Sequence, residues 1–424
     1  MRAGRPGGRA LAGLPAPASA NELALLRFPD RRTAWVVAAA ATLAEPAGRL
    51  EGRLAALHRA VPMTGARLRG EVWHPGSPPD PLIADGDPLH AAALLDRFDL
   101  ATQPPLRVVI GSEGYRLAVA CHHAAFDGRS LVALLAALTG GVDNLEHLDS
   151  GSATLPLRGA EPRRAGLGAA RVEEGPRREG PRGEGPRGEG PGRRVPEVRG
   201  LVGRMLRPAD RVAASPGRHV REALAVREVR LGGAGVTERL AEAAVAAAGA
   251  RNVRMGRPWR RVGINVGLAG RPAPAGPAEP GGGGAADPGG SVGPGGGVPL
   301  GNSSRYRRLD LRPGVPVGPV LRAALASPRE PLDQVWSPRL GWLLEPVMGR
   351  FSDSLLVSNL GRCVVPGATR LEFFPVARGR SAVAVGAAGL AGGPSTVSVR
   401  ARDLSSEDAE ALLEDLVARL AGQA

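Results

Sequence analysis

The segment between residues 98 and 138 constrains the fold most, because it reads as two strands, a short polar loop and a helix in direct succession. Residues 105–110 and 115–121 are rich in apolar and β-branched side chains and are separated by Gly-Ser-Glu-Gly, which predicts a hairpin. After the loop at residues 122–128, leucines recur on one helical face at positions 131, 134, 135 and 138, and two glycines follow. The sequence therefore predicts a hairpin that leads through a polar corner into a helix.

Similar elements recur along the rest of the chain. Apolar periodicity predicts helices around Leu50, Leu54 and Leu57 and over residues 236–250. Ser405 and Asp408 form a capping-box pattern ahead of a last amphipathic helix, which Gly422 closes. Further strands are expected at residues 261–268, 371–376, 381–385 and 396–401. Strands that alternate with helices in both halves predict an α/β protein of mixed α+β character.

Two segments without apolar periodicity divide the chain. Residues 155–208 contain a five-residue repeat of Glu, Gly, Pro and Arg at 174–190, and residues 272–299 are rich in Gly and Pro. Such compositions bury too little apolar surface to offset the entropy lost on ordering. The first segment is therefore predicted to be a flexible insert and the second a mobile loop.

The first 20 residues raise the question of a secretory signal, because they have Arg near the start and end in Ala-Ser-Ala. Pro15 and Pro17 interrupt the short apolar stretch between them, so a disordered tail is expected over residues 1–20. An N-terminal subdomain is then predicted at residues 21–154 and a C-terminal subdomain at residues 209–424.

The composition of the 424 residues excludes several classes of protein. A hydrophobic share of 43% without an apolar run of about 18 residues argues against a disordered chain and against a membrane span. The net charge of +14 would suit a polyanion, but every basic residue is arginine and aromatic residues make up only 3%, so nucleic-acid binding is disfavoured. Two cysteines cannot build a disulfide framework, which makes the cytoplasm the expected location.

The polar corner after the second strand carries the residues best suited to catalysis. Alternation along the strand sends His122 and His123 to opposite faces, so that only one of them can line a given cavity. A neutral imidazole at a strand end can accept a proton from a hydroxyl or an amine as a general base. Asp127 can hold neighbouring groups by hydrogen bonds or an ion pair, and Gly128 leaves room for a close approach to the backbone.

Other interpretations of the same residues are weighed beside the catalytic one. A histidine in a strand is usually structural, which is the interpretation favoured for His122. A metal site is disfavoured, because neighbouring strand residues diverge and neither a HExxH nor a Cys/His zinc spacing is present. Cys121 has apolar neighbours and is expected to pack in the core rather than to act as a nucleophile.

His122, His123, Asp127 and Gly128 have the spacing HHxxxDG. With this motif the segment from residue 98 to residue 131 resembles the chloramphenicol acetyltransferase-like superfamily. That superfamily includes nonribosomal peptide condensation domains, polyketide-associated acyltransferases, wax ester synthases and plant BAHD acyltransferases. The motif alone is moderately specific, and Phe-Asp-Leu at residues 98–100 and Pro-Leu-Arg at 105–107 strengthen it. Weaker matches follow in the expected order at residues 264–271, 301–302, 357–361 and 404–420.

The resemblance implies two similar subdomains that meet in a V, with an active-site tunnel between them. The acyl donor would be a thioester of coenzyme A or of a carrier protein's phosphopantetheine arm, with no bound cofactor and no metal. By the same resemblance His123 would be the general base that deprotonates the acceptor, or would position it. His122 and Asp127 would support the site, and Arg271 would be a candidate ion-pair partner of Asp127.

Two residues of the second half are candidates for contact with the substrate. By resemblance Ser358 and Asn359, placed on a crossing strand, would donate hydrogen bonds near the developing oxyanion, and the alternative is that they form a turn after a strand. The DFGWG motif of several branches of the superfamily is absent, and Ser-Asn-Leu-Gly-Arg stands in the comparable region.

The function expected from the sequence is an acyltransferase that makes an ester or an amide in natural-product or lipid biosynthesis. The alternatives are a condensation enzyme that depends on carrier-bound partners and a catalytically silent relative that recruits other proteins. No carrier or adenylation domain is recognised in the sequence, so a free-standing enzyme that receives its donor in trans is expected. An excess of arginine suits an acidic carrier protein or the phosphates of coenzyme A, with an alcohol or an amine as the acceptor.

Overall fold

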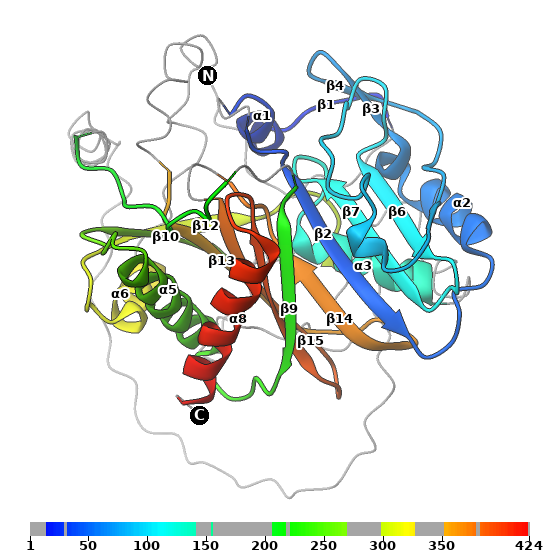
Figure 1. The fold of residues 1–424 in the computed structure, drawn as a ribbon. Coiled ribbons are helices and arrows are strands. Elements are labelled where there is room, and N and C mark those ends of the chain that lie inside the picture. The colour runs from blue at the N-terminus through cyan, green and yellow to red at the C-terminus, as the bar shows by residue number, and fades with distance from the viewer. Residues whose placement is uncertain are drawn as a thin grey trace, which may run out of the picture.

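The computed structural model describes residues 14–28, 32–140, 154–155, 206–217, 221–268, 298–326, 352–378 and 382–422. Within these ranges most of the chain is arranged around two large β-sheets with helices packed against them (Figure 1). The mixed α/β architecture predicted from the sequence is confirmed. The insert repeat at 174–190 and most of the loop at 272–299 lie outside the described residues.

The first sheet has five strands in the order β14-β2-β7-β6-β5. The predicted hairpin is confirmed: Leu106 lies opposite Cys121 in an antiparallel pair. Helix α3 packs against β2 and β7, and α2 packs against α3. The elements are β2 (Val36–Leu43), α2 (Leu50–Ala60), β5 (Leu82–Ala84), β6 (Leu106–Gly111), β7 (Arg116–His122) and α3 (Gly128–Thr139). Nearly every residue of β2 is buried, since the sheet is covered on both faces there.

The second sheet has six strands in the order β12-β10-β13-β15-β16-β9. Strands β10, β13 and β15 are parallel and the remaining pairs are antiparallel. The strands are β9 (Ala223–Val229), β10 (Val262–Leu268), β12 (Arg305–Leu311), β13 (Leu355–Cys363), β15 (Val383–Leu390) and β16 (Ser395–Ala401). This topology places the parallel strands, and the residues at their carboxyl ends, in the interior of the sheet.

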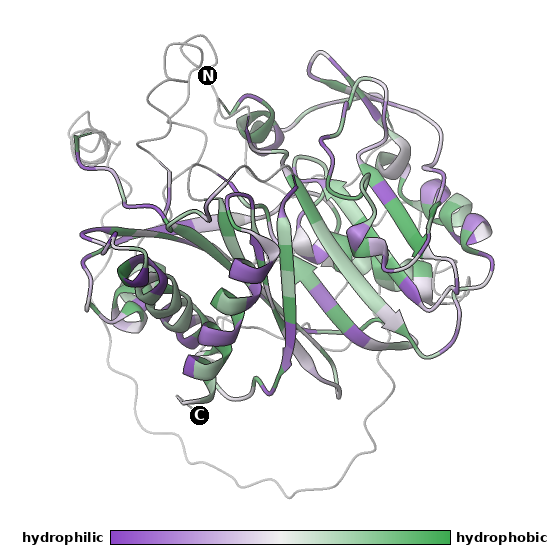
Figure 2. Cartoon of the chain, viewed as in Figure 1, coloured by the Kyte–Doolittle hydropathy of each residue, from purple (hydrophilic) through white to green (hydrophobic). Residues whose placement is uncertain are grey.

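Helices α5 (Val236–Arg254) and α8 (Ser406–Ala421) lie side by side on one face of the second sheet, and α6 (Val317–Ala326) lies near β12 (Figure 1). The predicted helices at residues 50–57, 236–250 and 405–422 are confirmed. In Figure 2 strand β2 is predominantly hydrophobic, whereas the ribbon of α8 alternates between hydrophilic and hydrophobic residues. That alternation is the expected pattern of a helix with one face on the sheet and one in water.

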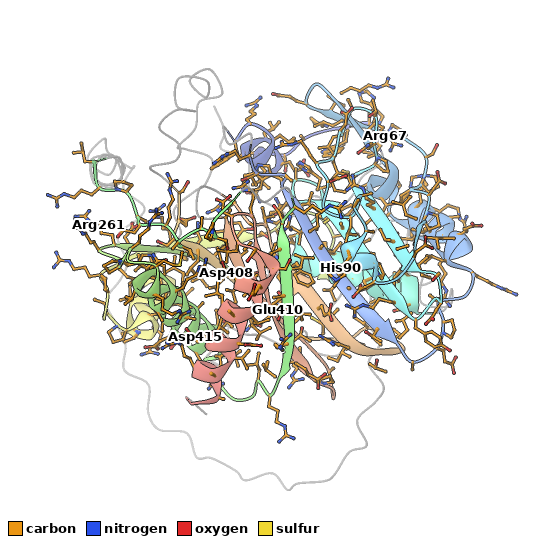
Figure 3. All side chains as sticks on the ribbon, in the orientation of Figure 1. Arg67, His90, Arg261, Asp408, Glu410 and Asp415 are labelled. Atoms are coloured by element: carbon orange, nitrogen blue, oxygen red, sulfur yellow. The ribbon has the colours of Figure 1, made fainter. Side chains whose placement is uncertain are left out.

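The start of α8 differs in detail from the predicted capping box. Ser405 accepts a hydrogen bond from the backbone of Asp408 at 3.1 Å, which is half of the box. The carboxylate of Asp408 is instead bound to Arg251 of α5 at 2.9 Å and to Ser215. Figure 3 shows Asp408, Glu410 and Asp415 along α8. Asp408 therefore joins α8 to α5, because a charged arginine is a stronger partner for the carboxylate than a backbone amide.

Strand β14 (Ala368–Phe374) corrects the predicted division at residues 209–424. Although it follows β13 in the chain, β14 leaves the second sheet and pairs antiparallel with β2 in the first. Arg400 of β16 is buried at this seam and donates to the backbone carbonyls of Val36 and Pro375. The first sheet is thus completed by a strand from the C-terminal half, because β2 would otherwise expose an unpaired edge.

The predicted tail at residues 1–20 also needs correction, since residues 14–20 are part of the fold. Strand β1 (Ala16–Pro17) pairs with β4 (Val72–His74), which pairs with β3 (Arg67–Arg69). Helix α1 (Ala20–Leu26) begins with a complete capping box between Ser19 and Glu22.

Short elements complete the description. Two 3₁₀ helices lie at Pro62–Gly65 and Pro88–His90. Strand β8 (Thr154–Leu155) pairs with β11 (Val298–Pro299), so one end of each predicted mobile segment forms a strand. No helix of the described ranges has both the length and the apolar character required to cross a bilayer.

Candidate active site

A small cavity lies where β7, α3, β12, β13 and β14 come together. Its lining includes His123, Tyr306, Ser358, Asn359 and Phe373. The cavity volume is about 30 Å³, which is room for roughly two water molecules. Since its walls come from both sheets, the cavity lies at the junction of the two halves of the molecule.

His123 is held at the end of β7 by three contacts. Its backbone amide donates to the carbonyl of Trp35 at 2.7 Å. Ring atom Nδ1 lies 3.2 Å from the carbonyl oxygen of Phe126, and Nε2 lies 2.6 Å from the hydroxyl of Tyr306. A carbonyl oxygen only accepts, so the proton of the neutral ring is on Nδ1 and Nε2 carries the lone pair. The Tyr306 hydroxyl therefore donates to Nε2.

The charge state of His123 follows from its environment. Burial lowers the pKa of the ring, and the positive charge of Arg378 lowers it further, while the Phe126 carbonyl and Asp127 act in the opposite direction. The side chain is only 2% exposed. A lowered pKa leaves the imidazole neutral at physiological pH, which is the form that can accept a proton.

Tyr306 is the site residue that the sequence analysis missed. Removal of its hydroxyl from solvent raises the pKa of Tyr306 to about 12; the charge of Asp127 adds to this effect, while Arg378 and a hydrogen bond from Ser304 oppose it. The phenol is therefore neutral and acts as a donor. The chain has only two tyrosines, and this one lies in a strand rich in arginine, but nothing local to that strand indicates contact with His123.

His122 lies outside the cavity lining, as strand alternation predicts for the neighbour of His123. Its Nδ1 accepts a hydrogen bond from the backbone of Ala124 at 3.2 Å, and its ring meets the edge of Phe98 with centroids 6.3 Å apart. Burial, with smaller contributions from electrostatic repulsion by His123 and Arg97, lowers the pKa of His122 to about 3. The His122 ring is neutral and supports the loop at residues 122–128 from the side opposite His123.

Asp127 joins the corner to the strand that carries Tyr306. One carboxylate oxygen accepts from the backbone of Ser130 at 2.9 Å, which caps the N-terminus of α3. The other oxygen accepts from the backbone and the hydroxyl of Ser303, at 3.0 and 2.8 Å. The backbone amide of Asp127 donates to Gly301 at 3.0 Å. Both carboxylate oxygens are therefore engaged within the described residues, while Arg271, the partner expected for Asp127, lies outside them.

Gly128 is required by close packing rather than by its backbone angles. A Cβ atom built at this position would lie 2.8 Å from the ring of Phe373 and 3.1 Å from the side chain of Leu360. These two residues come from β14 and β13, so the absence of a side chain at residue 128 allows the first turn of α3 to meet both strands.

Ser358 and Asn359 both line the cavity, but they lie on β13 inside the second sheet, and the crossing strand is β14. The amide of Asn359 donates to Thr237 at 3.1 Å and accepts from the backbone of Gly361 at 2.9 Å. The pairing with β15 shifts register here, and Gly361 has a φ of 72°. Asn359 thus stabilises a bulge, which bends the end of β13 at the cavity.

Two further expectations concern Cys121 and metal ions. Cys121 is fully buried, its thiol lies 3.5 Å from the carbonyl of Phe126, and burial raises its thiol pKa well above the usual range. It packs in the core and is not a thiolate. Among the residues that the structure describes, no cluster of three or more His, Cys, Asp or Glu side chains could hold a metal ion.

Comparison with known proteins gives a likeness in fold and none in sequence. No protein-family model matches the chain, and no curated protein matches it. The starter condensation domain of rhizomide synthetase, a mutant in complex with C8-CoA and Leu-SNAC, superimposes with a TM-score of 0.53 at 12% identity, over 96% of this chain and 93% of that one. The first condensation domain of the calcium-dependent antibiotic synthetase, in complex with a substrate analogue, gives a TM-score of 0.52 at 14% identity, over 96% of both chains.

The chain therefore has the fold of condensation domains. This is the fold that the HHxxxDG resemblance implied. Over nearly its whole length the chain follows these domains in spite of the low sequence identity, so the likeness concerns architecture rather than individual residues.

Proposed function

We propose that the protein is an acyltransferase that moves an acyl group from a thioester of coenzyme A or of a carrier protein to a hydroxyl or amine acceptor. The observation that carries this proposal is the tautomer of His123. Its Nδ1 proton is bound to the Phe126 carbonyl, and its Nε2 lone pair accepts from Tyr306, which lines the same cavity as His123. A neutral imidazole fixed in this way is suited to general-base catalysis.

In the proposed reaction His123 takes a proton from the acceptor as the acceptor attacks the thioester carbonyl. The carbonyl electrons move onto oxygen to form a tetrahedral oxyanion, which then collapses and breaks the carbon–sulfur bond. The departing thiolate takes the proton from the His123 imidazolium, so the base is regenerated and no cofactor is consumed. Ser358, which lines the cavity, is the proposed hydrogen-bond donor to the oxyanion; a well-placed donor stabilises such a transition state by roughly 3 kcal/mol.

The roles of the other predicted residues follow from their contacts. Asp127 and Gly128 position the loop that carries His123, and His122 supports it from the other side. Asn359 stabilises the bulge of β13 rather than donating to the substrate. The donor class is supported by charge, because the net charge of +14 suits the phosphates of coenzyme A or an acidic carrier protein. A natural-product pathway is proposed from the fold, since both similar structures are domains of synthetases.

One observation favours a second candidate, the catalytically silent relative that recruits other proteins. The space beside His123 holds only about two water molecules, and the Tyr306 hydroxyl occupies Nε2. A site with so little free space beside the base would suit a scaffold. The two candidates differ in whether His123 supports turnover.

The test is thiol release from a panel of acyl-coenzyme A and acyl-carrier thioesters with mixed alcohol and amine acceptors. His123→Ala should reduce turnover by about 10²- to 10⁴-fold, the usual effect of removing a general base. His74→Ala, at a histidine that lies outside the cavity lining, is the matched control and should retain the wild-type rate. Release that does not depend on His123 would refute the assignment of the base, and no release from any donor would favour the scaffold.

A further inference from the structure

Tyr306 occupies the position that the acceptor must take. Its hydroxyl lies 2.6 Å from Nε2 of His123, and the two rings meet edge to face with centroids 6.2 Å apart. An acceptor hydroxyl or amine has to donate to the same lone pair before it can attack a thioester. The Tyr306 hydroxyl therefore makes the hydrogen bond to Nε2 of His123 that the acceptor would otherwise make.

The ring of Tyr306 is held in place from its other side. The guanidinium of Arg378 lies 5.0 Å from the ring centroid, in the range of a cation–π contact. Arg378 is in turn ion-paired with Asp353 at 2.9 Å, and Arg308 binds the other carboxylate oxygen of Asp353 at 2.8 Å. These contacts connect the ring to three charged side chains. The surrounding residues therefore hold Tyr306 in its position against His123.

The cavity leaves little room for an acceptor while this contact is in place. About two water molecules fit beside His123, whereas an alcohol or amine with a carbon skeleton needs more room. Water is small enough to enter, but it meets a base whose lone pair is already bound. An acceptor that moves the Tyr306 side chain would release Nε2, and water that leaves the side chain in place would not.

We propose that Tyr306 is a specificity-determining residue that caps the general base His123 and suppresses hydrolysis of the acyl donor until an acceptor displaces it. This inference rests on the function proposed above. The hydroxyl, rather than the ring, makes the contact with Nε2, so Tyr306→Phe removes the cap and leaves the shape of the site nearly unchanged. Tyr115→Phe, at the only other tyrosine of the chain and on the exposed surface, is the matched control.

The first readout does not depend on turnover. Nitrogen-15 NMR of the histidine side chains reports the contact directly, because the resonance of an unprotonated ring nitrogen moves downfield when it loses a hydrogen-bond donor, and His123→Ala identifies the signal of His123. Tyr306→Phe removes the donor to Nε2, so the Nε2 resonance of His123 should move downfield from its wild-type position. Tyr306→Ala, which also removes the ring, should move this resonance downfield as well, and Tyr115→Phe should leave it unchanged.

The second readout is thiol release without an acceptor, compared with release in its presence. Tyr306→Phe should raise the ratio of hydrolysis to transfer by about two- to tenfold, while circular dichroism shows the wild-type fold. The same Nε2 resonance position of His123 in the wild type and in Tyr306→Phe would overturn the cap. A shifted resonance with an unchanged hydrolysis ratio would overturn its role in specificity, and the resonance still reports on the contact if no donor is turned over at all.

Discussion

The carboxylate of Asp127 should be the most costly single group to alter at the corner, and Asp127→Asn tests this without a change of shape. The amide oxygen of the variant can still accept from the backbone of Ser130. The amide NH₂ replaces the oxygen that accepts from both the backbone and the hydroxyl of Ser303, at 3.0 and 2.8 Å. The new NH₂ group would then face the backbone amide and the hydroxyl of Ser303, which are also donors. Only the hydroxyl can rotate to accept a hydrogen bond from it.

The magnitude follows from the two hydrogen bonds concerned. A hydrogen bond to a charged group contributes about 1.5–3 kcal/mol, and one such bond is lost outright while the other is replaced by a weaker neutral one. The residue is only 4% exposed, so water does not take over these contacts. Asp127→Asn should therefore lower the free energy of unfolding by about 2–3 kcal/mol, and turnover should fall because the segment leading to Tyr306 loses its anchor.

The assay is urea unfolding followed by circular dichroism, with thermal melting as a second measure. Asp99→Asn is the matched control: Asp99 accepts from the backbone of Ala101 and the hydroxyl of Thr102 in a similar turn, but it is exposed. Its effect should stay within about 0.5 kcal/mol, as for most surface substitutions. If Asp127→Asn changes stability no more than Asp99→Asn does, the argument that Asp127 joins α3 to β12 is wrong.

Two other perturbations test the packing and the charge state of the corner. Gly128→Ala would place a Cβ atom 2.8 Å from the ring of Phe373, so it should destabilise the fold by about 1–3 kcal/mol in the same urea assay, and a neutral result would refute the close-approach argument. The second is acidification: the unfolded chain protonates His122 near pH 6.5 and the native chain only near pH 3, so the unfolded state binds more protons in this window. Stability should fall as the pH falls, by about 2 kcal/mol from this residue between pH 6.5 and 5. In His122→Gln the unfolding free energy should depend less on pH over that range, whereas in the exposed control His90→Gln it should match the wild type. The same dependence of the unfolding free energy on pH in all three proteins would contradict the buried neutral ring of His122.

The local elements were predictable because their patterns are local. The hairpin of β6 and β7, the helix α3 with its leucine face, and the divergence of His122 from His123 all follow from alternation or from helical spacing within a few residues. The same holds for α2, α5 and α8. The HHxxxDG resemblance rests on one such continuous segment, which is why it indicated the fold in spite of the low identity to known structures.

The wrong expectations concern contacts between distant residues. The transfer of β14 to the first sheet depends on the open edge of β2, and nothing in β14 itself distinguishes one sheet edge from another. Ser358 and Asn359 were assigned to a crossing strand for the same reason. Residues 14–20 were assigned to a tail because a two-residue strand carries no periodicity of its own.

By itself the sequence determined the polar corner, the identity of the general-base candidate and the mixed α/β architecture, because these depend on neighbours along the chain. Only the tertiary structure decided what faces that base. Tyr306 lies 183 positions from His123, and Ser303 lies 176 positions from Asp127. Such contacts form when two sheets close on each other, and a hydrogen bond across that junction depends on the packing of both halves rather than on the local pattern of either one.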